Sequence, residues 1–180
     1  MSFFFRPLMA GLAMTCALPA LAQNAAPPVG AEPSSTSATF GDWVTRCSRE
    51  SADAKVNVCE TVQTLVPQGQ SNPIAQIALG RLSPKAPLRL TIILPVNIAF
   101  EKQAQMQVEE QPASAVSLTW RRCAPGGCYA DLEIKPETIN LWRAAAKAGQ
   151  ISFRNAANQD VVMPFSFRGL GQALDALPKT

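Results

Sequence analysis

The stretch Leu88-Arg89-Leu90-Thr91-Ile92-Ile93-Leu94-Pro95-Val96 decides the class of fold, because an apolar side chain occupies every second position from its first residue to its last. A β-strand points successive side chains to opposite faces, so this period of two predicts a half-buried strand with one inner face. Val161, Met163, Phe165 and Phe167 repeat the pattern. Shorter alternating runs predict further strands, at residues 56–62, 74–82, 117–123 and 151–154.

Turn-forming residues separate these runs and indicate how the strands connect. Pro67-Gln68-Gly69 and Pro125-Gly126-Gly127 lie between runs, and Asn155-Ala156-Ala157-Asn158 predicts a hairpin. Many short strands with few helices predict an all-β fold, mainly an antiparallel β-sandwich or a partly open barrel, with one or two short helices. Periodicity alone does not choose between the sandwich and the barrel.

One helix interrupts the strand pattern. Pro136 suits the first helical position, and Ile139 and Trp142 share a face at a spacing of three. Gly149 stands where it could cap the end of this helix. A second short helix is expected at residues 170–177, where Pro178 stops it.

The first residues of the chain have the pattern of a secretory signal peptide, which we expect at residues 1–22. Arg6 supplies the positive charge, and a short apolar run leads to Ala20-Leu21-Ala22, a small-residue cleavage site. The run is about half of the roughly 20 residues that a membrane-spanning helix requires, so no transmembrane segment is expected in the mature chain. Residues 23–39, rich in Ala, Pro, Ser and Thr, are expected to be a flexible linker, and residues 40–180 a single β-rich domain.

The cysteines predict two disulfides. Cleavage of the leader removes Cys16 and leaves four cysteines, an even number behind an export signal. We expect the pairs Cys47–Cys59 and Cys123–Cys128, because each joins neighbouring stretches of chain that a strand-turn-strand unit brings together. The alternative is a zinc site made by the four thiolates, but the spacings between the cysteines are irregular for such a site.

The absence of histidine narrows the possible chemistry. The chain has no His at all, which excludes histidine bases and histidine metal ligands. The formal net charge of +3 is too small to indicate a nucleic-acid-binding protein. Two carboxylate pairs, Glu109-Glu110 and Asp131/Glu133, are the basis of an alternative function as a carboxylate-based hydrolase of envelope glycans. We expect no enzyme activity and no cofactor.

A basic and aromatic segment is the one candidate binding surface. Arg121 and Arg122 follow Trp120, and such a group could bind an anion or a glycan by charge and stacking. The alternative is that the arginines protect the edge of a strand while the tryptophan packs in the core. Trp43 and Trp142 are expected to be core anchors.

An ordered set of short segments runs along the chain: Phe40-Gly41-Asp42-Trp43, Arg46-Cys47, Val58-Cys59, Leu88 to Val96, Trp120 to Cys123, Gly127-Cys128-Tyr129-Ala130, Ala148-Gly149 and Pro164 to Leu174. This set resembles the invasion-associated locus B family of bacterial envelope proteins. One departure is Arg168-Gly169-Leu170, where the family often has Gly-Phe. The resemblance implies an all-β envelope domain, periplasmic or surface-associated, without established catalytic residues. Its founding members are linked to host-cell invasion.

Together these patterns predict a non-enzymatic exported domain with a binding or accessory role, whose partner is an unknown envelope or host protein. The expected location is the periplasm, with outer-membrane association or secretion as alternatives. A hydrolase of envelope glycans and a structural subunit of an envelope complex remain the competing functions.

Overall fold

The computed structural model describes residues 33–49, 57–69, 71–83 and 85–178, all within the second of two units into which the chain divides, Pro33–Thr180. The predicted signal peptide, residues 1–22, and the predicted linker as far as residue 32 lie outside the described residues. Neither described helix combines the length and the hydropathy needed to cross a membrane.

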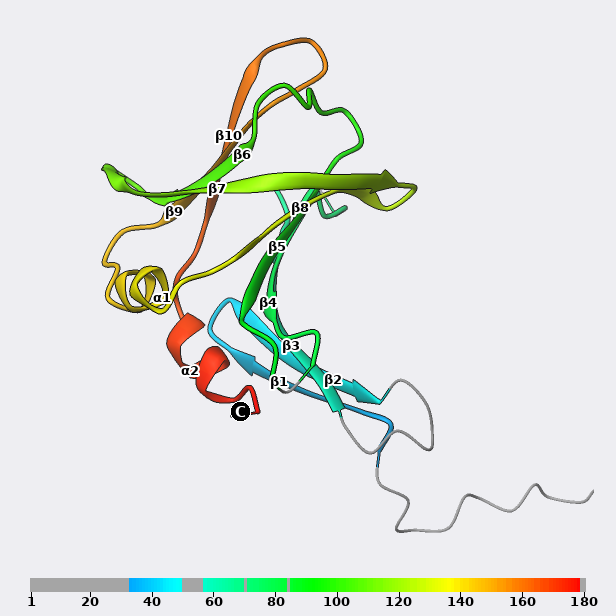
Figure 1. The fold of residues 1–180 in the computed structure, drawn as a ribbon, viewed down its shortest axis with the longest axis vertical. Helices are drawn as coiled ribbons and strands as arrows, with labels where there is room; N and C mark the ends of the chain where they lie inside the picture. The colour runs from blue at the N-terminus through cyan, green and yellow to red at the C-terminus, as the bar shows by residue number, and fades with distance from the viewer. Residues whose placement is uncertain (1–32, 50–56, 70, 84, 179–180) are drawn as a thin grey trace, which may run out of the picture. The chain divides into compact units, whose positions relative to one another are not determined.

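Ten strands form one antiparallel sheet in the order β1-β2-β3-β4-β5-β8-β7-β6-β9-β10 (Figure 1). Their bounds are β1 Ser35–Phe40, β2 Trp43–Arg49, β3 Asn57–Leu65, β4 Ala75–Gly80, β5 Arg89–Leu94, β6 Ala104–Val108, β7 Gln111–Ala124, β8 Gly127–Glu133, β9 Gly149–Arg154 and β10 Asp160–Phe165. Since β1 and β10 stand at the two ends of this order, the sheet is open. The predicted all-β, antiparallel class with two short helices is confirmed.

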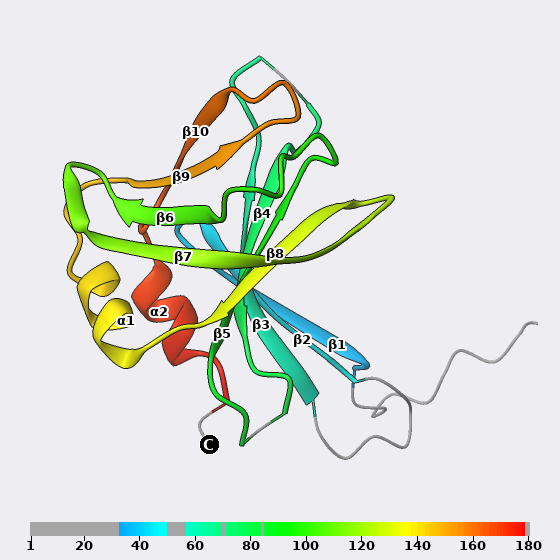
Figure 2. The ribbon, with the colours of Figure 1, turned by 45° about the horizontal axis from the view of Figure 1, so that its top comes forward.

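The longest strand, β7, joins the two halves of the sheet. Its first part pairs with β6 as far as Leu118, and its second part pairs with β8 from Thr119 onward. Figure 2 shows β7 running past both partners, with the β7–β8 hairpin extending beyond the rest of the sheet. One continuous strand, β7, therefore belongs to both halves of the sheet.

The core lies on the inner face that the alternating pattern predicts. Leu90, Ile92 and Leu94 of β5 are at most 1% exposed, whereas Val96, beyond the end of the strand, is 64% exposed. Met163 and Phe165 of β10 are also buried, and so are Trp43 and Trp142, the two predicted core anchors. Burying large side chains of this kind is the main favourable contribution to folding.

Strand β1 corrects the predicted boundary between linker and domain. Residues 35–39 were expected to be flexible, but they form β1, which pairs with β2 from Ser35↔Ser48 to Phe40↔Trp43. Their side chains are exposed, so hydrophobic alternation could not reveal the strand. The backbone ladder with β2 and the β-branched threonines favour the extended form.

The two helices lie next to each other beside the sheet (Figure 2). They are α1, Pro136–Arg143, and α2, Leu170–Asp175, and an ion pair between Arg143 Nη2 and Asp175 Oδ1 at 2.9 Å joins them. The expected helix cap, Gly149, is instead the first residue of β9. A Cβ atom at this position would lie 2.1 Å from Cζ of Phe165, so the close approach of the buried ring explains the glycine.

Candidate functional site

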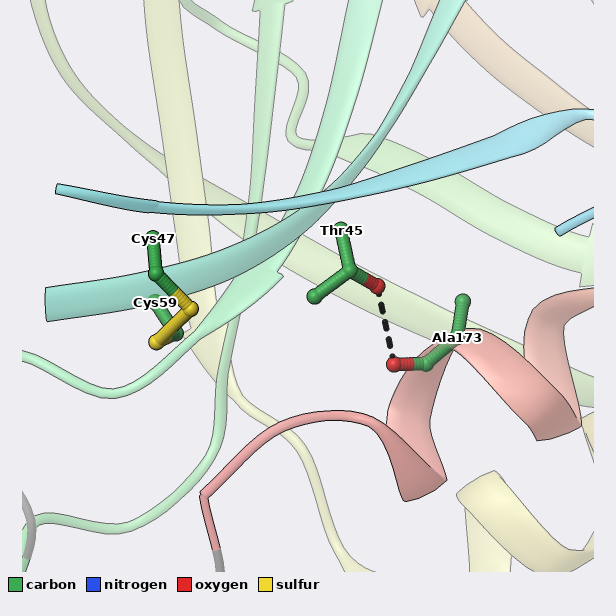
Figure 3. Close-up of a disulfide and its surroundings, with 4 residues drawn as sticks. All are labelled: Thr45, Cys47, Cys59 and Ala173. Carbon is green, nitrogen blue, oxygen red and sulfur yellow. Dashed lines mark hydrogen bonds between the residues drawn. A yellow bond between two sulfur atoms is a disulfide. The ribbon is translucent and has the colours of Figure 1, made fainter. Parts of the chain in front are cut away.

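Two disulfides join directly opposed residues on neighbouring strands. Cys47 of β2 and Cys59 of β3 have Cα atoms 4.0 Å apart, and Cys123 of β7 and Cys128 of β8 have Cα atoms 3.9 Å apart. These are the predicted pairs, and they use all four sulfur atoms that the zinc alternative requires. Figure 3 shows the first disulfide between β2 and β3. It also shows the contact of β2 with α2, in which the Thr45 hydroxyl donates to the carbonyl oxygen of Ala173 at 3.0 Å.

A β-bulge divides the predicted binding surface between two faces of the sheet. Trp120 stands opposite Ala130, but Arg122 stands opposite Tyr129, so the register shifts at Arg121. Because Ala130 and Tyr129 are successive residues of β8, their side chains lie on opposite faces. The bulge therefore leaves Trp120 on the face of the buried Ala130 and turns Arg122 to the outer face.

The arginines of the outer face have partners within the protein. Arg121 Nη2 lies 3.0 Å from Asp131 Oδ1, and Arg89 Nη1 contacts the same oxygen at 2.7 Å. The Arg122 guanidinium lies over the Tyr129 ring, 5.3 Å from its centroid. The two predicted basic residues thus lie together, where ion pairing and cation–π contacts hold them.

Trp120 belongs to a separate aromatic contact. Its ring meets that of Phe100 edge to face, with centroids 5.9 Å apart, and its indole N–H donates to the Lys102 carbonyl oxygen at 2.8 Å. The predicted trio of Trp120, Arg121 and Arg122 therefore contributes to two surfaces.

Three of the four candidate carboxylates have partners. Asp131 and Glu133 share one face of β8, as alternate residues of a strand do, but Asp131 accepts hydrogen bonds from two arginines. Glu110 pairs with Lys147, and Glu109 accepts a long contact of 3.5 Å from the Gln150 amide. Each pair thus includes a carboxylate held by a cation.

A groove of about 700 Å³ lies between the end of β3 and strand β10. We call it the seam groove, because it follows the open edge of the sheet. Apolar side chains form both walls: Leu65, Val66 and Ile74 on the β3–β4 side, and Met163, Pro164 and Phe165 on the β10 side. Its size is within the range of about 300–1,000 Å³ that is typical of ligand sites.

Gln63 closes one end of the seam groove. Its Nε2 donates to the Ser166 carbonyl oxygen at 3.0 Å, and its Oε1 accepts from the Ser166 N–H at 2.9 Å. The Trp43 indole N–H donates to the same carbonyl oxygen at 2.9 Å. The side-chain amide of Gln63, only 3% exposed, thus stands in for the backbone of a neighbouring strand.

The outer edge of β10 is turned toward this seam. Alternate residues of an antiparallel strand direct their backbone groups to the same side. Ser166 directs its N–H to Gln63, away from β9, so Val162 and Pro164 direct their backbone groups away from β9 as well. Pro164 has no N–H, which suits a position outside the ladder. Among the described residues, β9 is the one strand that pairs with β10, so the carbonyl oxygens of both residues and the Val162 N–H form a free edge.

An ion pair stands at the closed end of the groove. Arg168 Nε donates to Asp42 Oδ2 at 3.0 Å, and Arg168 Nη2 donates to Oδ1. The guanidinium holds the pKa of the Asp42 carboxyl below its usual value, and a hydrogen bond from Ser166 lowers that pKa further. The Asp42 carboxylate therefore keeps its charge to a lower pH than an unpaired aspartate does.

Sequence reasoning missed the seam groove. Gln63 and Ser166 are 103 residues apart, and the wall residues belong to separate elements. Only the full topology brings them together.

These features define a class of protein: an open antiparallel β domain, bridged by two disulfides, with a groove along one edge strand. The family model described as "Invasion associated locus B (IalB) protein" matches residues 43–178, and the chain belongs to this family. The crystal structure of invasion associated protein B from Bartonella henselae is similar in fold, with a TM-score of 0.64 and 20% sequence identity over 78% of this chain and 94% of that chain. A comparison with curated protein sequences finds no match.

Proposed function

We propose that this protein is a non-enzymatic, exported envelope domain that binds an extended segment of a partner protein along β10. The observation that carries the proposal is the seam groove, in which a free backbone edge lies beside apolar walls. Added strands are recognised in this way elsewhere: backbone hydrogen bonds supply affinity, and pockets for alternate side chains supply specificity.

The free groups of β10 support an extended ligand. Val162 lies next to Met163, the first lining residue of the groove on β10; it offers both an N–H and a carbonyl oxygen, and its side chain is 57% exposed. The Gln63 amide already bonds both backbone groups of Ser166, so a bound segment would continue that pattern from Pro164 toward the start of β10. The opposite wall, with Val66 and Ile74, would receive the segment's apolar side chains.

Export to the periplasm is part of the same proposal, with outer-membrane association or release as its finer variants. Membership of the family and two disulfides support it, because disulfides persist in oxidising compartments. The partner is a protein of the envelope or of a host cell. The name of the Bartonella relative supports the host cell as one source.

Site-specific photo-crosslinking in intact bacteria tests the binding site. A photoreactive phenylalanine analogue in place of Val162 should capture one partner, and mass spectrometry should map the crosslink to an extended segment of it. The same analogue in place of Ser37 is the matched control, since Ser37 is an exposed residue of the other end strand, β1, and lies away from the groove. Equal crosslinking at both positions would contradict the proposal.

A second experiment tests whether blocking the seam groove prevents the crosslink. Val66→Trp adds an indole to the groove wall, whereas Val96→Trp adds one at a comparably exposed position outside it; the two valines are 50% and 64% exposed. The crosslink at residue 162 should fall about tenfold in the first variant and persist in the second. If the purified protein hydrolyses peptidoglycan and Asp131→Asn abolishes this activity, the proposal that the domain is not an enzyme is wrong.

A further inference from the structure

A second pocket, of about 640 Å³, lies where the β4–β5 connection, α1 and the end of α2 meet. We call it the basic pocket. Leu88, Ile134, Ile139, Leu174 and Leu177 line it with aliphatic side chains, and all of these except Leu88 are fully or almost fully buried. An aliphatic lining of this kind suits a hydrocarbon chain, because removing apolar surface from water is favourable.

Charged side chains surround this aliphatic lining. Arg81, Lys135 and Arg143 line the pocket together with one carboxylate, Glu133, so its cations outnumber its anions by two. Arg143 shares its charge with Asp175, through hydrogen bonds of 3.2 and 2.9 Å.

Unlike Arg143, which pairs with Asp175, the other two cations of the pocket, Arg81 and Lys135, form no ion pair within the part of the chain that the structure describes. Two cations without a carboxylate partner, beside an aliphatic lining, complement a ligand with an anionic head and an apolar tail. Guanidinium and ammonium groups form their strongest hydrogen bonds with anionic oxygens.

We propose that the basic pocket binds a single-chain anionic amphiphile, with its alkyl chain on the aliphatic lining and its phosphate or carboxylate head between Arg81 and Lys135. This site is separate from the seam groove and goes beyond the proposed function. Each methylene that leaves water should raise the affinity roughly fourfold, so affinity rises with chain length until the pocket is filled.

Titration calorimetry on the protein expressed from the full chain tests this inference, with ligands kept below their micelle concentrations. Dodecyl phosphate and dodecanoate are the two anionic probes, and they distinguish a phosphate head from a fatty-acid head. Dodecyl maltoside and dodecyltrimethylammonium carry the same chain with a neutral and a cationic head. At least one anionic probe should bind about tenfold more tightly than both of these. Equal affinity for all four heads would overturn the proposal.

Matched variants locate the site. Arg81→Gln and Lys135→Gln should each weaken binding of the tighter anionic probe by about three- to tenfold. Lys102→Gln removes the same charge outside the pocket and should leave binding unchanged. If Lys102→Gln weakens binding as much as Lys135→Gln does, net charge rather than the pocket holds the ligand, and the proposal fails.

The last set of variants tests whether blocking the basic pocket abolishes binding. Asn140→Trp places an indole in the basic pocket from the exposed side of α1, and Leu141→Trp places one on the next residue, which does not line it. Binding should be lost only in the first variant, with near-ultraviolet circular dichroism confirming that both are folded. Val66→Trp, which blocks the seam groove, should leave amphiphile binding intact, so this inference and the proposed function can fail independently.

Discussion

The side chain of Gln63 forms the hydrogen bonds that the backbone of a neighbouring strand would otherwise form. Its amide makes both hydrogen bonds that a neighbouring backbone would offer to Ser166, at 3.0 and 2.9 Å. This contact joins β3 to the segment after β10. It therefore limits how far β3 and the end of β10 can move apart. The sequence gives no sign of this role, because a glutamine in a strand is most often a solvated residue.

Replacing Gln63 tests the importance of this contact. Gln63→Leu keeps the size of the side chain but leaves the partly buried Ser166 N–H without its acceptor, so we expect the free energy of unfolding to fall by about 1–3 kcal/mol. Urea unfolding measures the change. Gln76→Leu is the control, because its amide makes only a 3.5 Å contact with Thr64 Oγ1, and a loss within about 0.5 kcal/mol is expected there. Equal losses in the two variants would contradict this role.

At the scale of elements, alternation predicts strands only where the two faces differ in burial. Strand β5 and strand β10 have one buried face and were therefore predicted with their inner residues correct. Strand β1 is exposed on nearly all its side chains and was missed. The bulge at Arg121 was also not predicted from the sequence. It depends on how β7 pairs with β8, and no local pattern encodes that pairing.

Pro164 tests how β10 is kept from pairing with other strands. A free edge invites edge-to-edge association, and a proline there removes a donor and blocks it. Pro164→Val restores the N–H on the exposed edge, so we expect a concentration-dependent dimer that sediments faster in analytical ultracentrifugation than the parent protein does. Adding Val162→Lys should reverse the effect, because an edge lysine opposes pairing. Unchanged sedimentation of Pro164→Val would show that the edge is protected by other means.

For the whole molecule, the strand order could not be predicted from the sequence. β8 lies between β5 and β7, and β6 lies between β7 and β9, so the order depends on contacts distant in sequence. Such choices follow from the packing of complete elements rather than from propensity. The seam groove and the basic pocket are products of that order, which is why neither was foreseen. The disulfides were foreseen because each closes a local hairpin.

The two disulfides should therefore contribute unequally to the stability of the molecule. Cys47 and Cys59 are 12 residues apart, and Cys123 and Cys128 are 5 apart. On the chain-entropy account, the longer loop restricts the unfolded chain more, which gives about 3 kcal/mol for the first bridge and about 2 kcal/mol for the second. Urea unfolding of the two double Cys→Ala variants measures this difference. A larger loss on removing Cys123–Cys128 would mean that native packing at the β7–β8 hairpin, and not the unfolded chain, sets the contribution of the bridges.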